Sequence, residues 1–358
     1  MAFPATVSGY FPLNRSFFEW TTYITRKNLN KMNPINRPKL LPFIGRFTLL
    51  HLVIYFSVGY VFLFFQDLLP ASGRFALDLY EPFRALGSMA VSGQILRGLA
   101  FALVFYPFYN VIFENVRGRI IMFGAMWGVA LFGSVEPQPG SIEGIIYTTI
   151  SFTEHLYVLL AVAAQMLLFV WLFFKWETFS QKRSGPSELE ITKGLESPDN
   201  PKIPVYTPEK IRGYTIRFGI VHLVTYWVIG SLYYQIAGYA DALQEMEIFE
   251  MWRDLESISA VLLVFFGQIF RGPVLALLLF PFYGIYINKK HGWMLLFLLM
   301  FGLTALGSPL FLSEFILFEG TFIEFLKELF IGIPEIVTQM LVFSLIFFWW
   351  QRKSERKK

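Results

Sequence analysis

Eight apolar stretches, most of them near twenty residues long, constrain this chain more than any other feature. A helix of ~20 apolar residues crosses ~30 Å of hydrocarbon, and it satisfies its own backbone hydrogen bonds there. The sequence therefore predicts an all-α integral membrane protein with eight transmembrane helices. They are expected at about 44–66, 95–115, 119–135, 156–176, 214–236, 257–287, 293–308 and 331–350, with 119–135 and 293–308 the short ones.

Composition agrees with a membrane class. Hydrophobic residues make up 55% of the chain and charged residues only 16%, against roughly 25% charged in ordinary soluble domains. Cysteine is absent, which excludes disulfides and thiol chemistry. The net charge of +4 is explained by basic residues beside the apolar stretches, so nucleic acid is not an expected partner and the lipid bilayer is.

The chain contains an internal repeat. Residues 267–272 read Gly-Gln-Ile-Phe-Arg-Gly, and residues 93–98 read Gly-Gln-Ile-Leu-Arg-Gly. Further matches keep the same order and a nearly constant offset, which argues against chance. They include Arg46 with Arg217, His51 with His222, Tyr55 with Tyr226, Gly133-Ser134 with Gly307-Ser308, Glu143 with Glu319, Glu154 with Glu328, and Gln165 with Gln339.

The repeat divides the chain. Four spans per copy is an even number, so both copies enter the membrane from the same side, as parallel repeats with pseudo-two-fold symmetry and a natural site between them. The expected parts are a basic, interfacial N-terminal segment (1–43), membrane repeat 1 (44–177), a polar linker (178–213), membrane repeat 2 (214–351) and a basic tail (352–358).

The distribution of cations predicts the orientation. If the N-terminus is cytoplasmic, most Lys and Arg fall on the cytoplasmic side, including the linker and the tail. Because positive residues are enriched in cytoplasmic loops, we expect a multi-pass protein of the cell (plasma or inner) membrane with both termini in the cytoplasm.

Depth counting sorts the polar residues into two layers. At ~1.5 Å of rise per helical residue, the two arginines of the repeated motif fall near the outer boundary and the paired histidines fall near the inner one. The outer layer comprises Gln94, Arg97, Glu154 and their copies Gln268, Arg271 and Glu328, with Glu143 and Glu319 on candidate re-entrant segments. The inner layer comprises His51 and His222. Arginines and histidines are not expected to meet.

Each polar group has a functional and a structural interpretation. Arg97 and Arg271 suit recognition of a carboxylate or phosphate, or pair with Glu154 and Glu328, or reach the outer headgroups. His51 and His222 are candidate ligands of one haem or metal between the halves, or each bonds a neighbouring helix. Glu143 and Glu319 are candidate receivers of a cation or proton, or caps of the re-entrant segments.

Three functional hypotheses follow. The leading one is a transporter or permease that binds a small anionic solute or lipid headgroup between the repeats, with no cofactor. The second is a non-catalytic membrane subunit or scaffold with protein partners or as a homo-oligomer, and the third is a haem-binding redox protein that uses His51 and His222. The chain has no nucleophile elbow, phosphate loop, HExxH motif or paired-Cys spacing, which disfavours an enzyme.

Overall fold

The computed structural model describes residues 37–68, 87–135, 137–184, 206–237, 239, 252–254, 257–305 and 332–356. Within these ranges the regular elements are helical, apart from one antiparallel bridge between Thr148 and Trp252. The all-helical expectation is confirmed for this part of the chain.

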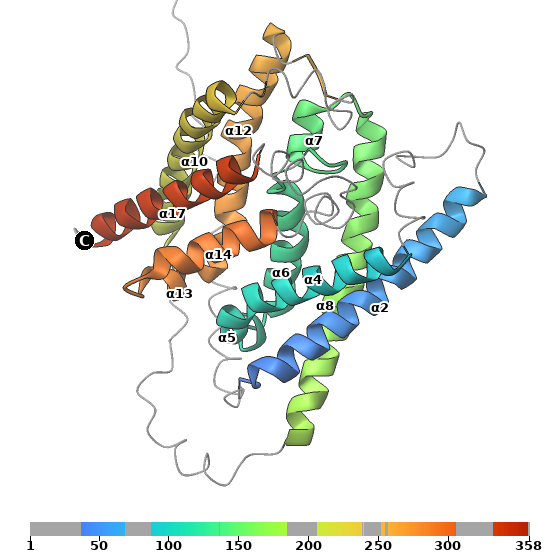
Figure 1. Cartoon of the computed structure of the whole chain (residues 1–358). Coiled ribbons are helices and arrows are strands. Elements are labelled where there is room, and N and C mark those ends of the chain that lie inside the picture. The colour runs from blue at the N-terminus through green and yellow to red at the C-terminus, as the bar shows by residue number, and fades with distance from the viewer. Residues whose placement is uncertain are drawn as a thin grey trace, which may run out of the picture.

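The predicted apolar stretches coincide with helices (Figure 1). In the first half these are α2 (Leu40–Asp67), α4 (Gly87–Phe105), η2 (Tyr106–Phe108), α5 (Tyr109–Phe113), α6 (Gly118–Phe123), η3 (Gly124–Phe132), α7 (Ile142–Tyr147) and α8 (Phe152–Ser184). In the second half they are α10 (Pro208–Ile236), α12 (Ile258–Leu279), η5 (Phe280–Phe282), α13 (Tyr283–Ile287), α14 (Gly292–Thr304) and α17 (Ile333–Glu355).

Six helices among the described residues are long and apolar enough to cross a membrane, fewer than the eight expected. The shortfall lies in the two stretches that already looked short in the sequence. Helix α14 has 13 residues, which is about 20 Å of rise against ~30 Å of hydrocarbon. The combined α6–η3 helix, Gly118–Phe132, is also below spanning length.

Proline interrupts two of the long helices at matching places. Pro107 lies in the 3₁₀ turn η2 and Pro281 in the 3₁₀ turn η5, and a short α-helix continues after each turn. Proline has no backbone N–H and its ring crowds the preceding turn, so the tighter 3₁₀ form replaces the α-helix locally. The two halves thus share a local change of helix type at matching prolines.

The helices of the first half pack antiparallel. Arg46 near the start of α2 contacts Glu177 near the end of α8, with 2.5 Å between Nε and Oε1. Toward the other end of the same pair, the rings of Phe62 and Tyr157 are 5.5 Å apart. Helix α6–η3 also runs antiparallel to α8: Gly118 at its start faces Phe174, and Trp127 further along donates from Nε1 to the Leu159 carbonyl at 3.1 Å.

The second half has the corresponding contacts. Arg217 near the start of α10 contacts Gln351 near the end of α17, with 2.7 Å between Nε and Oε1. At the other end of the pair, the hydroxyls of Tyr233 and Thr338 are 3.0 Å apart. Helix α14 packs against α17 as α6–η3 packs against α8.

Aromatic side chains fill the interior while large apolar side chains cover the outside. Phe47 and Phe173 in the first half, and Phe218 and Phe347 in the second, are completely buried. Exposed apolar side chains lie along the long helices, including Leu49, Val53, Leu160, Trp171, Val228, Phe266 and Phe270. Such an exterior suits contact with lipid, since no hydrophobic force drives these residues inward in a bilayer.

The two halves meet through α4, η3, α12 and α14. The rings of Phe108 and Phe282 are in contact at 5.1 Å. Gly128 of η3 faces Leu278, whose side chain would lie 2.8 Å from an added Cβ, and Gly302 of α14 faces Val104 in the same close manner. These glycines allow the backbones of the two halves to approach closely.

Candidate functional site

Helix α12 places Gln268 and Arg271 one turn apart, and both side chains are buried (0% and 4% exposed). The helix is capped at its start by Ser257, whose hydroxyl accepts a hydrogen bond from the Ala260 backbone. Close packing against α10 follows from Gly272, where an added Cβ would lie 3.0 Å from the Cα of Gly219. The repeated motif therefore supplies both the polar groups and the glycine that brings α10 close to them.

Arg271 caps the C-terminal end of η3, a helix in the other half of the chain. Its Nη2 donates to the carbonyl of Gly133 at 2.7 Å and to that of Ser134 at 2.9 Å. The last carbonyls of a helix lack partners within it and carry the negative end of the helix dipole. The buried guanidinium of Arg271 donates hydrogen bonds to these carbonyls and places a positive charge at the negative end of the dipole.

Glu143 on α7 forms an ion pair with Arg271 through Oε1. Helix α7 starts after Gly140, whose φ of 82° suits glycine. Ser141 caps the helix by accepting from the Gly144 backbone at 2.8 Å. This turn brings Glu143, which is 3% exposed, from the first half against α12 of the second.

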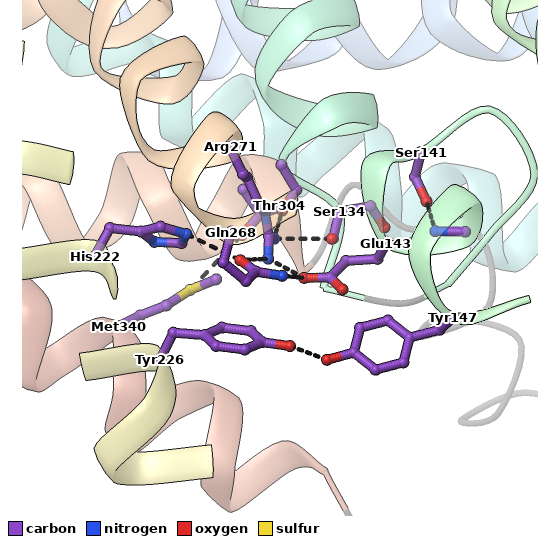
Figure 2. Close-up of polar contacts among 12 residues, drawn as sticks. Ser134, Ser141, Glu143, Tyr147, His222, Tyr226, Gln268, Arg271, Thr304 and Met340 are labelled. Atoms are coloured by element: carbon purple, nitrogen blue, oxygen red, sulfur yellow. Dashed lines mark hydrogen bonds and ion pairs between the residues drawn. The ribbon is translucent and has the colours of Figure 1, made fainter. Parts of the chain in front are cut away.

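Gln268 joins the ion pair to His222 of α10 (Figure 2). Its Nε2 donates to Glu143 Oε1 at 3.0 Å, because a carboxylate only accepts. Its Oε1 therefore faces His222 Nε2 at 3.1 Å and Arg271 Nη1 at 3.4 Å. Since Oε1 is an acceptor, the histidine donates from Nε2.

Two tyrosines lie beside this network. The hydroxyls of Tyr147 on α7 and Tyr226 on α10 form a hydrogen bond (Figure 2). Tyr226 is one turn from His222 on the same face of α10, as the spacing predicts. The bond is a further link between the two halves.

Two atoms of the ion pair have no hydrogen-bond partner among the described residues. They are Oε2 of Glu143 and Nε of Arg271, and both are buried. Buried polar atoms are nearly always hydrogen-bonded, so each unpaired one calls for an explanation. Here an unsatisfied acceptor and an unsatisfied donor belong to the same ion pair.

The first half contains the matching histidine and glutamine contact. His51 Nε2 lies 3.1 Å from Gln94 Oε1, and both side chains are buried. Arg97 lies over the ring of Phe101, with its Cζ 5.6 Å from the centroid. Glu328, an expected partner of the motif arginines, and Glu319, the match of Glu143, lie outside the described residues.

The predicted pairing of Arg271 with Glu154 is not found: its acidic partner among the described residues is Glu143, and Glu328 lies outside them. Glu154 lies in the first turn of α8, where its Oε2 accepts from the Ser151 backbone at 3.0 Å and from the Ser151 hydroxyl at 2.7 Å. The cause is local, since a serine three residues before a glutamate forms a reciprocal cap at a helix start.

The predicted separation of histidines from arginines is also wrong. One atom, Gln268 Oε1, contacts both His222 and Arg271. Depth counting measured each helix separately from its inner loop. In the structure, Gly272 of α12 lies against Gly219 and His222 of α10, so these positions of the two helices are side by side.

The histidines are positioned by glutamines within their own halves. His51 contacts Gln94 and His222 contacts Gln268, in each case through Nε2. Haem ligation by this pair stays a prediction, and it would require a ring nitrogen to face the space between the halves. The described residues include no group of three or more His, Cys, Asp or Glu side chains arranged to hold a metal ion.

Sequence reasoning missed the carbonyls of Gly133 and Ser134 and the hydroxyl of Tyr147 as parts of this network. A signal for the first two was present, because Gly133-Ser134 recurs as Gly307-Ser308 in the repeat. Tyr147 had no such signal, and only the approach of α7 to α10 reveals it.

Compared with protein-family models, with curated proteins and with solved structures, the chain gave no match in any of the three comparisons. The fold and the apolar helices define a multi-pass, all-helical membrane protein. Its function must be argued from the buried network itself.

Proposed function

We propose that this protein is a membrane transporter for a small anion, with its site at the Glu143–Arg271 pair between two repeats. The observation that supports it is a buried ion pair that joins the two halves and leaves Glu143 Oε2 and Arg271 Nε without partners in the described part of the chain. Ionisable groups at membrane depth are costly and typically mark substrate or proton pathways.

The proposal includes a duplicated frame with pseudo-two-fold symmetry. Three contacts at the junction support it. Phe108 and Phe282 are 174 positions apart, so they are equivalent residues, and they touch each other. The contact of Gly128 with Leu278 has as its counterpart the contact of Val104 with Gly302, at the same offset. Reciprocal contacts of this kind characterise a two-fold interface.

The frame also includes eight crossings with both termini in the cytoplasm. Helix α6–η3 runs along α8 from the level of Phe174, which Gly118 faces, to that of Leu159. The connection after η3 continues to Gly140, whose backbone donates to His155 Nδ1 at 2.8 Å near the start of α8. Helix α6–η3 and the connection after it together cross the membrane once. The distribution of Lys and Arg puts the start of this crossing on the cytoplasmic side.

The junction predicts a rescue between the halves. Gly302→Ala is expected to destabilise the protein by about 1–3 kcal/mol, because the new methyl group would overlap Val104 Cγ2. Adding Val104→Ala removes that atom, so the double variant is expected to recover about 1 kcal/mol or more relative to additivity. Thermal unfolding in detergent measures both effects. Strict additivity of the two changes would contradict the packing of α4 against α14.

The mechanism rests on competition for Arg271. In the empty site the guanidinium binds Glu143 Oε1. An anionic solute displaces that carboxylate, and Glu143 takes up a proton in compensation. The site then holds one positive and one negative charge in both states, which avoids the large cost of an unpaired charge in a low-dielectric interior. A singly charged anion such as acetate or lactate then moves together with one proton, so its transport is electroneutral.

The test uses thermal stabilisation of purified protein by a panel of acetate, lactate, succinate and phosphate. A ligand that binds only the folded state raises the unfolding midpoint. For the wild type, the shift caused by the binding anion is expected to grow as pH falls, because protonation of Glu143 accompanies binding. In Glu143→Gln the shift is expected to be larger and independent of pH, because the neutral amide leaves Arg271 to the anion.

The controls separate this site from general anion effects. Glu143→Gln/Arg271→Gln is expected to lose the anion-dependent shift, while Arg183→Gln, which removes an exposed cation at the end of α8, keeps it. Proteoliposomes that carry a pH gradient should accumulate the same anion with wild-type protein and not with the double variant. If every anion shifted the unfolding midpoint of the wild type and of the double variant equally, the proposal would be contradicted.

A further inference from the structure

A groove of about 520 Å³ lies along the N-terminal part of α10, and neither Glu143 nor Arg271 lines it. The stripe of α10 that borders it follows helical spacing, and Trp350 of α17 completes it. Its lining residues are Glu209, Arg212, Gly213, Ile216, Arg217, Ile220 and Trp350.

The two halves differ in how they neutralise the arginine at this position. In the first half, Arg46 Nε contacts the carboxylate of Glu177 at 2.5 Å. In the second half, Arg217 Nε contacts Gln351 at 2.7 Å, and this partner is a neutral amide. Among the described residues, Arg217 therefore has no carboxylate in direct contact, and its positive charge beside the groove is not paired as that of Arg46 is.

The acid of the second half lies one turn further along α17. Glu355 accepts from the Tyr283 hydroxyl and pairs with Lys210 at 2.9 Å. The first half has Gln181 in this position, and it donates to the Tyr109 hydroxyl at 2.5 Å. The acid and the amide have exchanged places between the two copies, and in the second copy the ion pair is made by Lys210.

Glycine leaves room for the guanidinium at the groove wall. An added Cβ on Gly213 would lie 3.2 Å from Nη2 and 3.4 Å from Nη1 of Arg217. These two nitrogens form the fork that binds phosphate oxygens. Arg212 lines the groove as well and is exposed.

The groove changes from polar to apolar along α10. Glu209 and Arg212 lie in the first turns, whereas Ile216 and Ile220 follow toward the middle of the helix and are 50% and 47% exposed. Arg217 lies between the two isoleucines in sequence, but its guanidinium reaches back to the level of Gly213. Two arginines and one glutamate leave one net positive charge beside exposed apolar side chains. This order matches a phospholipid, with a singly charged phosphate at the helix end and an acyl chain along the isoleucines.

We propose that this groove binds one anionic phospholipid, with the phosphodiester on Arg217 and Arg212 and an acyl chain against Ile216, Ile220 and Trp350. It is a lipid site of the second half alone, because Glu177 neutralises Arg46 in the first half. The inference does not depend on anion transport at Arg271.

The experiment measures lipid binding by native mass spectrometry of the full chain in detergent, titrated with phosphatidylglycerol or phosphatidylcholine. The wild type is expected to bind phosphatidylglycerol more tightly than phosphatidylcholine. Arg212→Gln/Arg217→Gln is expected to weaken phosphatidylglycerol binding about tenfold or more, and phosphatidylcholine binding much less, because the choline ammonium already offsets the charge of its phosphodiester. Lys182→Gln/Arg183→Gln, which removes two exposed cations at the end of α8, is the matched control and should bind as wild type does.

A second variant separates charge neutralisation from loss of a side chain. Gln351→Glu retains both arginines and gives Arg217 the acidic partner that Arg46 has, so it is expected to weaken phosphatidylglycerol binding several-fold. Inorganic phosphate at millimolar concentration should not displace the lipid, because it lacks the acyl chain. Unchanged phosphatidylglycerol binding in both the arginine double variant and Gln351→Glu would overturn the proposal, and so would full displacement by phosphate.

Discussion

Replacing Arg271 by Gln is expected to lower the free energy of unfolding by about 3–5 kcal/mol, because it leaves the buried carboxylate of Glu143 without a compensating charge. The substitution also removes the guanidinium that donates hydrogen bonds to the Gly133 and Ser134 carbonyls at the end of η3. Unfolding of the purified protein in mild detergent, followed by heat or denaturant, measures the effect.

Glu143→Gln/Arg271→Gln is the informative partner of that variant. With both charges removed, the double variant is expected to recover much of the stability, because replacing a buried ion pair by neutral groups is often close to neutral. The amide oxygen introduced at position 143 can still accept from Gln268, so the hydrogen bonds that link positions 143, 268 and 222 are retained. Arg183→Gln controls for the removal of a cation and should change stability by no more than about a few tenths of a kcal/mol.

This cycle would contradict the structure if Arg271→Gln and the double variant were equally unstable, since Glu143 would then not be the partner of Arg271. The cycle does not depend on a transported solute. A stable double variant that still responds to anions would support the ion pair and count against its proposed role in binding.

Gly292→Ala is expected to destabilise the protein by several kcal/mol, more than the roughly 1–3 kcal/mol usual for overpacking. A Cβ at this position would overlap the backbone carbonyl oxygen of Tyr286, which cannot move without breaking the turn between α13 and α14. Gly118 stands at the equivalent turn between α5 and α6, and its Cβ would overlap the carbonyl oxygen of Ile112. Folding yield and the unfolding midpoint of each variant measure the effect.

Two other glycines provide a matched control. Gly45 and Gly59 lie in α2, and an added Cβ would have nothing within 4 Å at either place among the described residues. Alanine is the better helix former by about 1 kcal/mol, so Gly45→Ala and Gly59→Ala are expected to be neutral or slightly stabilising. If Gly118→Ala and Gly292→Ala behaved like these two, the tight turns described between the helices would be incorrect.

The helices could be read from the sequence because their cause is local. Each expected apolar stretch coincides with a helix, and the short stretches at 119–135 and 293–308 are those whose helices fall below spanning length. Length and apolar content decide whether a segment can cross hydrocarbon, and both are visible in the sequence. The helix extends beyond the apolar stretch in α10, which begins at Pro208 whereas the stretch begins at 214.

The partners of the polar residues could not be read in the same way. The sequence indicated that Arg271 needs a companion, but depth counting selected Glu154 and Glu328 and separated the arginine from His222. Glu143 was a candidate only because its segment was too short to span. Contacts between elements depend on how helices pack, and packing involves residues far apart in the chain.

By itself, the sequence determined the membrane class, the positions of the helices and the matched positions of the two Gly-Gln-Ile-x-Arg-Gly motifs, because apolar length and side-chain identity are properties of a single segment. Only the tertiary structure decided that Arg271 pairs with Glu143 across the two halves and that Arg217, unlike Arg46, contacts a neutral amide. The reason is physical: the cost of a buried charge requires a partner, but the packing of distant helices selects which one.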